Sequence, residues 1–419
     1  MALVVTKFGG TSVGTTERIL DVARRLVARS ESGDSVVAVV SAMGDVTDEL
    51  VSLAEAITVE PPVREMDMLL ATGEQVTIAL LAMAIHSLGH EAISFTGAQV
   101  GIVTDAGHTK AKIQEVRGDR VRSALEEGKI VIVAGFQGMT PDGQITTLGR
   151  GGSDTTAVAI AAGIGADLCE IYTDVDGVYT ADPRIVKDAR KIDVISYEEM
   201  LEMAATGAKV LQLRAVEFAR NHGVTLHCRS SFNDMPGTIV KEVDDTMEQA
   251  IISGVTHDTS EAKVTIRGVP DRPGVAAIVF NRLAEDNVNV DMIIQNVSEA
   301  GSTDISFTVP KEGLIRARNT TEAVAVDLGA RNWLLDESIA KISLVGAGMK
   351  THPGVAAQMF SALADAGVNL DMISTSSIRI SCVISRDQAD VAVRALHGSF
   401  GLSDAEVVAE VAPGCGGGD

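Results

Sequence analysis

Along the first 245 residues, short runs of β-branched residues alternate with segments whose apolar positions follow a helical period. The run at 36–41, VVAVVS, is apolar until its last position, as expected of a parallel strand buried on both faces. Residues 17–28 instead place their apolar positions on one side of a helix. Further strands are predicted at 92–97, 129–138 and 168–175, and further helices at 74–88 and 155–164. This alternation predicts one large α/β sandwich over residues 1–245.

The C-terminal part of the chain contains an internal repeat. Residues 273–293, PGVAAIVFNRLAEDNVNVDMI, and residues 353–373, PGVAAQMFSALADAGVNLDMI, are identical at 13 of 21 positions. A β-type run precedes each copy and another follows it, and the Pro–Gly pair suits the start of a helix. The repeat predicts two small α/β modules, at 250–335 and 336–419.

The chain is strongly acidic, with 35 Lys and Arg against 57 Asp and Glu and a formal net charge of −22. This balance argues against nucleic acids and anionic membrane surfaces as partners, because both require basic patches. The four cysteines form no CxxC pair, which argues against a zinc site or a disulfide framework. The N-terminus lacks the pattern of a signal peptide, and the longest apolar run, 78–85, is too short to span a membrane. We therefore expect a cytoplasmic protein.

Two glycine-rich segments follow predicted strands and precede predicted helices. KFGG begins at Lys7, and GRGGSDTTA occupies 149–157. Glycine lets backbone N–H groups approach a phosphate, and a helix N-terminus favours an anion, so the two segments predict two anion sites. Each segment taken alone is also compatible with a tight turn and a capped helix. KFGG differs from a Walker P-loop, in which the lysine follows the glycines.

A third polar segment, YTDVDGVYTADPR, occupies 172–184. Its DVDG resembles the start of a calcium loop, but the third acid and the final Glu of that pattern are missing, so we exclude a calcium site. A polar strand end followed by a tyrosine and an arginine fits the edge of a nucleotide site better.

Six segments together resemble the aspartate kinase family, and they occur in that family's order. They are KFGGTSVG (7–14), VVSAMGDVTD (39–48), LLATGEQ (69–75), GRGGSDTTA (149–157), YTDVDGVYTADPR (172–184) and GAKVLQLRA (207–215). The C-terminal repeat resembles the paired ACT domains of that family. The resemblance implies an amino-acid-kinase-type three-layer α/β/α sandwich over 1–245, followed by two ferredoxin-like βαββαβ ACT modules at 250–335 and 336–419.

The resemblance also implies phosphoryl transfer from MgATP to the side-chain carboxylate of L-aspartate, the first step of lysine, threonine and methionine biosynthesis. The implied ATP-binding residues are Lys7, Phe8, Gly9, Gly10, Ser41, Thr173, Asp174, Tyr179, Arg184 and Lys209. The implied aspartate-binding residues are Ser41, Thr47, Glu74, Arg150, Gly151, Gly152, Ser153 and Asp154. Arg184 and Lys209 are also compatible with exposed surface charges. We predict no protein ligand for Mg²⁺, because phosphates usually hold most of this ion.

The implied catalytic residues are Lys7, Glu74 and Asp154, and their chemistry suits the reaction. The attacking carboxylate of aspartate is ionised at pH 7, so no general base is needed. Catalysis then depends on positioning and charge neutralisation, and Lys7 can neutralise the transferring phosphoryl group. Arg150 can bind a carboxylate through two hydrogen bonds, while Glu74 and Asp154 can pair with the ammonium group. Glu74 is also compatible with a purely structural role as a helix cap.

The ACT pair implies allosteric control by lysine, threonine or both. We hypothesise an effector site made by Asp271 and Gln295 of the first copy with Asn369 and Leu370 of the second. Alternatively, Asp271 only caps its helix. ACT modules commonly pair across subunits, so we expect a homo-oligomer, or a hetero-oligomer with a shorter regulatory subunit that starts internally, for example at Met247.

Three other functions share parts of the pattern. A kinase for another small acid would share the glycine loops, but Glu74, Arg150 and Thr47 favour an amino acid with two carboxylates. A non-catalytic amino-acid sensor could keep the fold, although it need not keep Lys7, Arg150 and Asp154. A dehydrogenase is excluded because no GxGxxG follows the first strand.

Overall fold

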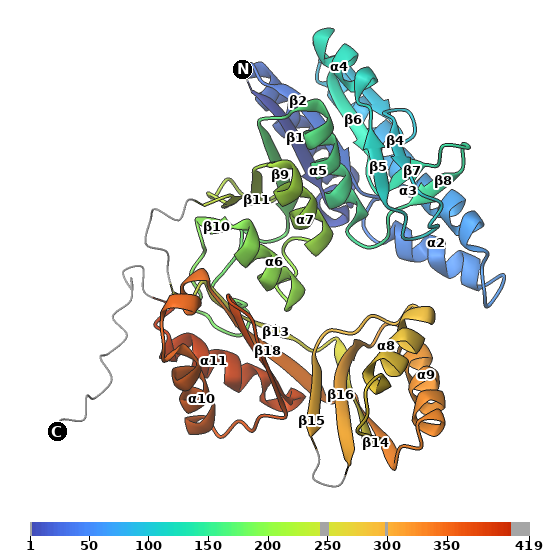
Figure 1. The fold of residues 1–419 in the computed structure, drawn as a ribbon. Helices are drawn as coiled ribbons and strands as arrows, with labels where there is room; N and C mark the ends of the chain where they lie inside the picture. The colour runs from blue at the N-terminus through green and yellow to red at the C-terminus, as the bar shows by residue number, and fades with distance from the viewer. Residues whose placement is uncertain (1, 244–250, 298–300, 404–419) are drawn as a thin grey trace. The chain divides into compact units, whose positions relative to one another are not determined.

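The computed structural model describes residues 2–243, 251–297 and 301–403, which form two compact units (Figure 1). The first unit takes its described residues from 1–178, 191–205 and 209–247, and the second takes them from 179–190, 206–208 and 248–419. The chain therefore passes from the first unit to the second and back more than once.

The first unit is built on an eight-stranded sheet with the order β10-β12-β11-β9-β1-β2-β6-β3. Neighbouring strands are parallel except for the antiparallel pair β11–β12. The strands are β1 (Leu3–Phe8), β2 (Ser35–Val40), β3 (Ala92–Phe95), β6 (Ile130–Ala134), β9 (Leu168–Thr173), β10 (Val194–Ser196), β11 (Leu226–Ser230) and β12 (Thr238–Lys241). Burial on both faces explains the continuous apolar runs of β2 and β6.

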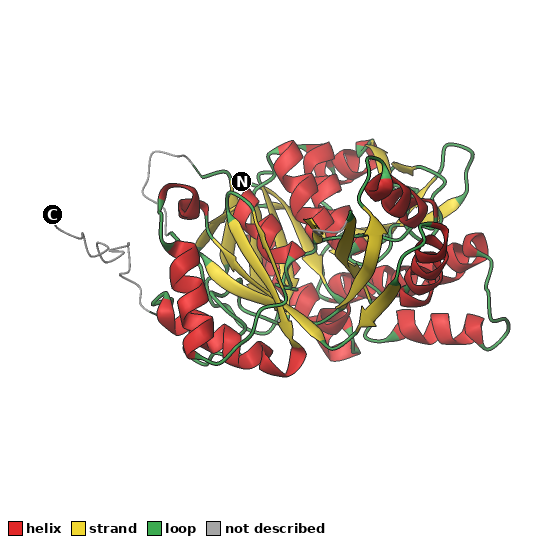
Figure 2. Ribbon diagram, turned by 60° about the horizontal axis from the view of Figure 1, so that its bottom comes forward, coloured by secondary structure: helices red, strands yellow, loops and turns green. Residues whose placement is uncertain are grey.

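Helices pack on both faces of this sheet, which gives the expected three layers. Figure 2 shows the helices of the molecule in red and its strands in yellow. α1 (Thr16–Glu31) and α3 (Val63–Ser87) share one hydrophobic core with alternate residues of β1, β2 and β6, including Phe8. Because side chains alternate along a strand, Lys7 faces the other side, where α5 (Gly152–Ile164) contacts β1. The other helices are η1 (Gly10–Val13), α2 (Val46–Glu55), α4 (Asp119–Glu126), α6 (Tyr197–Ala205) and α7 (Leu213–His222).

A small second sheet, β5-β4-β7-β8, belongs to the same unit. Its strands are β4 (Ile102–Thr104), β5 (Ile113–Val116), β7 (Gln137–Met139) and β8 (Ile145–Thr147). We expected a single strand over 129–138, but the chain forms two, because β6 ends at Ala134 and β7 begins at Gln137. Phe136, between them, has a φ of +70°, a left-handed conformation that interrupts any strand.

Among the described residues, α3 is the helix that is long and apolar enough to cross a membrane, with a mean hydropathy of 1.7 in its most apolar window. Half of that window is buried inside the fold, against α1, β3 and β6. The helix is thus a core element of the first unit. It begins at Val63, directly after two prolines, and not at residue 74 as the pattern predicted.

The second unit contains the two repeat modules, each with two helices packed on a four-stranded antiparallel sheet (Figure 1). The first module comprises β14 (Glu261–Pro270), α8 (Val275–Glu285), β15 (Ile293–Val297), β16 (Ser302–Pro310), α9 (Leu314–Asp327) and β17 (Asn332–Asp336). The second comprises β18 (Ile339–Val345), η2 (Ala347–Thr351), α10 (Val355–Asp365), β19 (Met372–Thr375), β20 (Arg379–Ser385), η3 (Arg386–Gln388) and α11 (Ala389–Ser399).

The fourth strand of the second module comes from an unexpected part of the chain. β13 (Gly254–Asp258) precedes the first module in sequence but pairs antiparallel with β18 of the second. The second module therefore receives residues that we assigned to 250–335, and the first module is inserted into it. Met247, suggested as an internal start, lies outside the described residues.

Another segment of the sequence assigned to 1–245 also belongs to the second unit. Residues 179–190 contribute Ala181 and Val186 to the core of the second module. The carbonyl of Thr180 accepts a hydrogen bond of 2.8 Å from the Val255 amide of β13. The boundary at 245 is therefore not a single cut in the chain.

Equivalent charged residues of the two repeats join the modules to each other. Lys263 pairs with Asp371, and the equivalent Lys341 pairs with Asp291 at 2.5 Å. Lys341 also contacts Glu261 at 2.7 Å, and its side chain is 1% exposed. Its pKa is raised, since the neighbouring carboxylates outweigh the opposing effect of burial.

Replacing Lys341 by methionine should destabilise the second unit by about 3 kcal/mol, because it leaves the buried Glu261 and the partly exposed Asp291 without their shared cation. The matched change at its more exposed counterpart, Lys263→Met, should cost about 1 kcal/mol or less. Differential scanning calorimetry of the two variants measures both effects. Equal destabilisation by the two substitutions would contradict the larger contribution of the buried Lys341 to the contact between the modules.

Candidate active site

Several predicted site residues of the first unit lie at the carboxyl ends of its central parallel strands or directly after them. Lys7 of β1 lies in register with Val39 of β2 and Ile171 of β9. The loops that follow these three strands therefore leave the sheet at the same edge. In open α/β sheets this edge is where ligands bind.

An ion pair joins the two glycine-rich segments. The Lys7 ammonium lies 2.6 Å from Asp154 Oδ1, and both side chains are largely buried. Asp154 occupies the first turn of α5, which Gly151 precedes with a φ of +72°. A Cβ on Gly151 would lie 2.2 Å from Cγ of Gln212, so both conformation and space require glycine there.

The KFGG loop is held close to the loop after β2. The Gly44 amide donates to the Gly10 carbonyl at 3.1 Å, and a Cβ on Gly10 would lie 3.0 Å from the Ala42 carbonyl oxygen. Gly9 leaves its side-chain position open toward the Lys7 ammonium. The Phe8 ring is buried in the core and stacks on Tyr172 at 4.7 Å, so only the backbone of Phe8 is available to a nucleotide.

Glu74 is a buried carboxylate in which one oxygen has no hydrogen-bond partner among the described residues. Its Oε1 accepts a hydrogen bond of 3.2 Å from the Ala42 amide, while Oε2 is buried without a partner among the described residues. Burial raises the pKa of Glu74 to about 7. An orphaned carboxylate oxygen of this kind is suited to an incoming cationic group, which would restore its lost interactions.

Two serines link Glu74 to the ion pair. The Ser41 hydroxyl donates to Ser153 Oγ at 3.0 Å, and these residues are the neighbours of Ala42 and Asp154. A Cβ on Gly135 would lie 2.6 Å from Ser153 Oγ, so Gly135 makes room for this contact. The structure thus brings together Lys7, Ser41, Glu74, Ser153 and Asp154.

Two further substrate candidates lie near members of this cluster in the sequence. Thr47 is half-buried in the first turn of α2. Arg150 is exposed, directly before Gly151, and forms no ion pair with any described residue. Its guanidinium therefore stays available to a ligand carboxylate.

The predicted nucleotide residues fall in both units. In the first unit, Thr173 ends β9 and donates to Asp174 at 3.0 Å, while Lys209 is exposed before α7. In the second unit, Tyr179 precedes the segment that packs on the second module, and Arg184 pairs with Asp182 at 2.6 Å. These five residues remain predicted ATP contacts.

Sequence reasoning missed the contribution of Phe136. Its backbone amide donates a hydrogen bond to Thr156 Oγ1 of α5 at 3.1 Å, and its ring would lie 2.8 Å from a Cβ on Gly152. A left-handed phenylalanine is uncommon and is held by its surroundings, here beside the GRGG segment. The GFQG that ends the run at 129–138 was the available signal.

The four predicted effector residues lie in both modules of the second unit. Asp271 follows β14 and donates through its backbone to Gly301, and Gln295 lies in β15. Asn369 is exposed, and Leu370 packs against the core of the second module. The effector site therefore stays a prediction.

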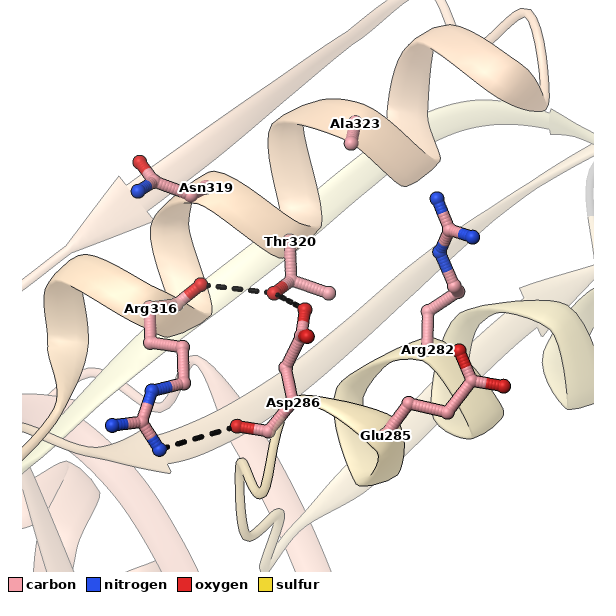
Figure 3. A pocket seen from close by; sticks show the side chains of 7 residues that line it. All are labelled: Arg282, Glu285, Asp286, Arg316, Asn319, Thr320 and Ala323. Carbon is pink, nitrogen blue, oxygen red and sulfur yellow. Dashed lines mark hydrogen bonds between the residues drawn. The ribbon is translucent and has the colours of Figure 1, made fainter.

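A shallow groove of about 340 Å³ lies elsewhere on the first module, between α8 and α9 (Figure 3). Asp286 in this groove accepts a hydrogen bond from Thr320, and its carbonyl accepts one of 3.3 Å from Arg316. The groove contains none of the four predicted effector residues. Its polar groups bond mainly to each other.

Comparison with known proteins agrees with this geometry. Residues 2–230 match the Amino acid kinase family, and 264–323 and 342–400 match the ACT domain. The aspartokinase of Mycolicibacterium smegmatis is 57% identical over 407 residues, which cover 96% of this chain and 97% of that protein. The chain belongs to the aspartokinase family. It is an aspartate kinase with a C-terminal ACT pair.

Two solved structures of the family resemble the whole chain. E. coli aspartokinase III in complex with aspartate and ADP, in its R-state, matches with a TM-score of 0.81 and 26% identity, covering 95% of this chain and 99% of that one. The same enzyme in complex with lysine and aspartate, in its T-state, matches with a TM-score of 0.75 and 25% identity over the same shares.

Glu74→Gln should stabilise the first unit at pH 8 by up to about 3 kcal/mol, because the wild-type carboxyl has its pKa raised from 4.5 to about 7. Unfolded chains release this proton near pH 4.5 and the folded protein holds it to about pH 7. The wild type therefore loses stability across that window as pH rises, and the variant does not.

Calorimetric unfolding of both proteins between pH 5 and pH 8 measures this difference. The variant's advantage should shrink toward zero at pH 5. A difference that does not depend on pH would contradict the raised pKa.

Proposed function

We propose that this aspartokinase transfers the γ-phosphoryl group of ATP to the β-carboxylate of L-aspartate through the Lys7, Glu74 and Asp154 cluster. The observation that carries the proposal is the unpartnered, buried Oε2 of Glu74, linked through Ser41 and Ser153 to the Lys7–Asp154 pair. A cation-seeking carboxylate beside a lysine and two glycine loops suits an amino acid and a phosphate in one site.

The substrate's groups find complementary partners in this cluster. The α-ammonium of aspartate pairs with Glu74, and its α-carboxylate binds the free guanidinium of Arg150. Ser41, Ser153 and Thr47 supply hydroxyl groups around the substrate. The β-carboxylate then lies toward Lys7, already ionised and able to attack.

Lys7 stabilises the charge of the phosphoryl group as it moves. Asp154 Oδ1 lies 2.6 Å from the Lys7 ammonium and holds it in position before any substrate binds. Gly9 and Gly10 offer backbone N–H groups beside it, with no Cβ in the way. Preorganised positive charge of this kind is usually the largest contribution to phosphoryl transfer.

We propose that ATP, with Mg²⁺, binds at this edge of the sheet through Thr173 and Asp174. Lys209, Tyr179 and Arg184 stay further predicted nucleotide contacts. Among the described residues no group of three or more His, Cys, Asp or Glu could hold a metal ion. We expect the phosphates to hold most of the Mg²⁺, as is usual for this ion, and the ion to neutralise their charge.

We further propose that the ACT pair makes this enzyme an allosteric control point in a cytoplasmic pathway to lysine, threonine and methionine. Two observations support this: the chain carries two ACT matches, and a relative was solved with lysine bound. Lysine, threonine or both would bind through Asp271, Gln295, Asn369 and Leu370. We expect a homo-oligomer, or a hetero-oligomer with a shorter regulatory subunit, because ACT modules commonly pair across subunits.

Lys7→Ala should lower kcat by about 10²–10³, because it removes the charge that stabilises the transferring group. Hydroxylamine trapping of the acyl phosphate formed from MgATP and L-aspartate measures the rate. Lys129→Ala, a lysine directly before β6 at the opposite end of the sheet, is the control and should keep the wild-type rate. Near-normal turnover in Lys7→Ala would contradict the proposed role of Lys7.

The KM for aspartate should rise as pH falls below 7, by about tenfold per pH unit, because only ionised Glu74 pairs with the ammonium group. Above pH 8 the KM should be constant. Glu74→Gln should show a high KM with no such dependence, as measured by initial rates at saturating ATP. A wild-type KM that stays flat from pH 8 to pH 6 would exclude this role.

A further inference from the structure

The helix that carries Glu74 also carries a second buried acid, Asp67. The two residues are seven positions apart on the buried face of α3, which corresponds to about 10 Å along the helix. Asp67 is 0% exposed. The proposed chemistry makes no use of it.

Asp67 is fully engaged by two other segments. Its Oδ1 accepts a hydrogen bond of 2.5 Å from the Thr147 hydroxyl and one of 3.0 Å from the Thr109 amide. Its Oδ2 lies 2.6 Å from Nδ1 of His108. A carboxylate removed from water needs such partners, and an apolar residue would fill the same space without needing them. The acid therefore has a purpose beyond filling the core.

One of its partners has a strained backbone. Thr109 has a φ of +66°, which is uncommon for any residue with a Cβ and rarer for a β-branched one. The hydrogen bond from its amide to Asp67 helps to hold this conformation. The carbonyl of Thr109 then lies 3.0 Å from the position that a Cβ on Gly149 would occupy.

Gly149 is the residue directly before Arg150, so this contact reaches the proposed substrate arginine. Thr147, two residues earlier, accepts a backbone hydrogen bond of 3.0 Å from Ala111. The loop that presents Arg150 is thus seated on residues 108–111, and both are attached to Asp67.

Arg214 of α7 also joins the segment before Arg150 to residues 108–111. Its guanidinium donates to the carbonyl of Leu148 at 3.0 Å and to that of Ala111 at 2.8 Å. Partial burial of the guanidinium lowers the pKa of Arg214. The segments before Arg150 are therefore bound on one side by Asp67 and on another by Arg214.

We propose that Asp67 is a positioning residue that fixes the Arg150 loop relative to Glu74 and so determines selection of aspartate over glutamate. The inference rests on the proposed roles of Glu74 and Arg150. These two groups would hold the substrate's α-carbon, while Lys7 stays fixed by Asp154. The distance from Glu74 and Arg150 to Lys7 then fits a substrate side chain with one methylene group, as in aspartate. A loosened Arg150 loop also accepts a side chain with two, as in glutamate.

Thr147→Val tests this, because it removes the hydroxyl that binds Asp67 while keeping the shape of the side chain. The KM for aspartate should rise about 10–100-fold, since a small misplacement of a binding group has effects of this size. The KM for ATP should change less than about twofold, and the ratio of kcat/KM for aspartate to that for glutamate should fall. Thr147→Ser restores the hydroxyl and should recover most of the affinity.

Thr146→Val is the matched control. Thr146 is the neighbouring residue on β8, is equally buried, and bonds to Thr104 at 2.6 Å, with no contact to Asp67. It should leave both KM values and the discrimination close to those of the wild type. If Thr147→Val does not fold, Asp67→Asn replaces it in the same comparison and should change the same quantities in the same direction.

Arg150→Ala, measured in parallel, separates the two possible failures. No acyl phosphate from aspartate in the wild type would overturn the proposed function itself. If the wild type is active and Arg150→Ala loses aspartate affinity, but Thr147→Val behaves like Thr146→Val, the positioning role of Asp67 is wrong and the proposed function stands.

Discussion

Burial of charge at the carboxyl edge of the parallel sheet is the constraint on which the rest of this site depends. Lys7 and Asp154 are largely buried, and each would be costly alone, but at 2.6 Å they offset one another. Their pairing ties the first strand to the start of α5. Ser41, Ser153 and Glu74 are grouped beside this fixed point.

Glu74 is also a buried acid, but only one of its two oxygens has a hydrogen-bond partner among the described residues. One oxygen is bound by the Ala42 amide and the other has no described partner, so burial raises its pKa to about 7. A folded protein that retains such a group gives up stability for binding. Asp67, on the same face of the same helix, has all its partners, which suits support of the site and not contact with substrate.

Local patterns were sufficient for much of the fold. The strand at 36–41 and the helix at 17–28 are confirmed as β2 and α1. Both could be predicted because the pattern of apolar residues within a short window indicates a buried strand or one face of a helix. Pairings between distant segments were not predictable. Nothing near β13 indicates that it joins β18 of the second repeat, and nothing in 179–190 indicates that it packs with that module. The break at Phe136 depends on contacts with α5 that periodicity does not report.

The site was predicted to a similar extent. Glycine loops and the family motifs identified Lys7, Ser41, Glu74, Ser153 and Asp154, and the structure brings these five together. The effector residues were proposed from the unequal turns of the two repeats, and they stay a prediction. The sequence of a turn does not report which distant segment packs against it.

The most direct test is calorimetric titration of L-aspartate into the protein at pH 7, in buffers with different ionisation enthalpies. If the substrate ammonium binds Glu74, the carboxyl must lose its proton, and a group with a pKa of about 7 then releases about half a proton per aspartate bound. Glu74→Gln should release none. Binding without proton release in the wild type, or the same release in both proteins, would contradict the central role given to this buried acid.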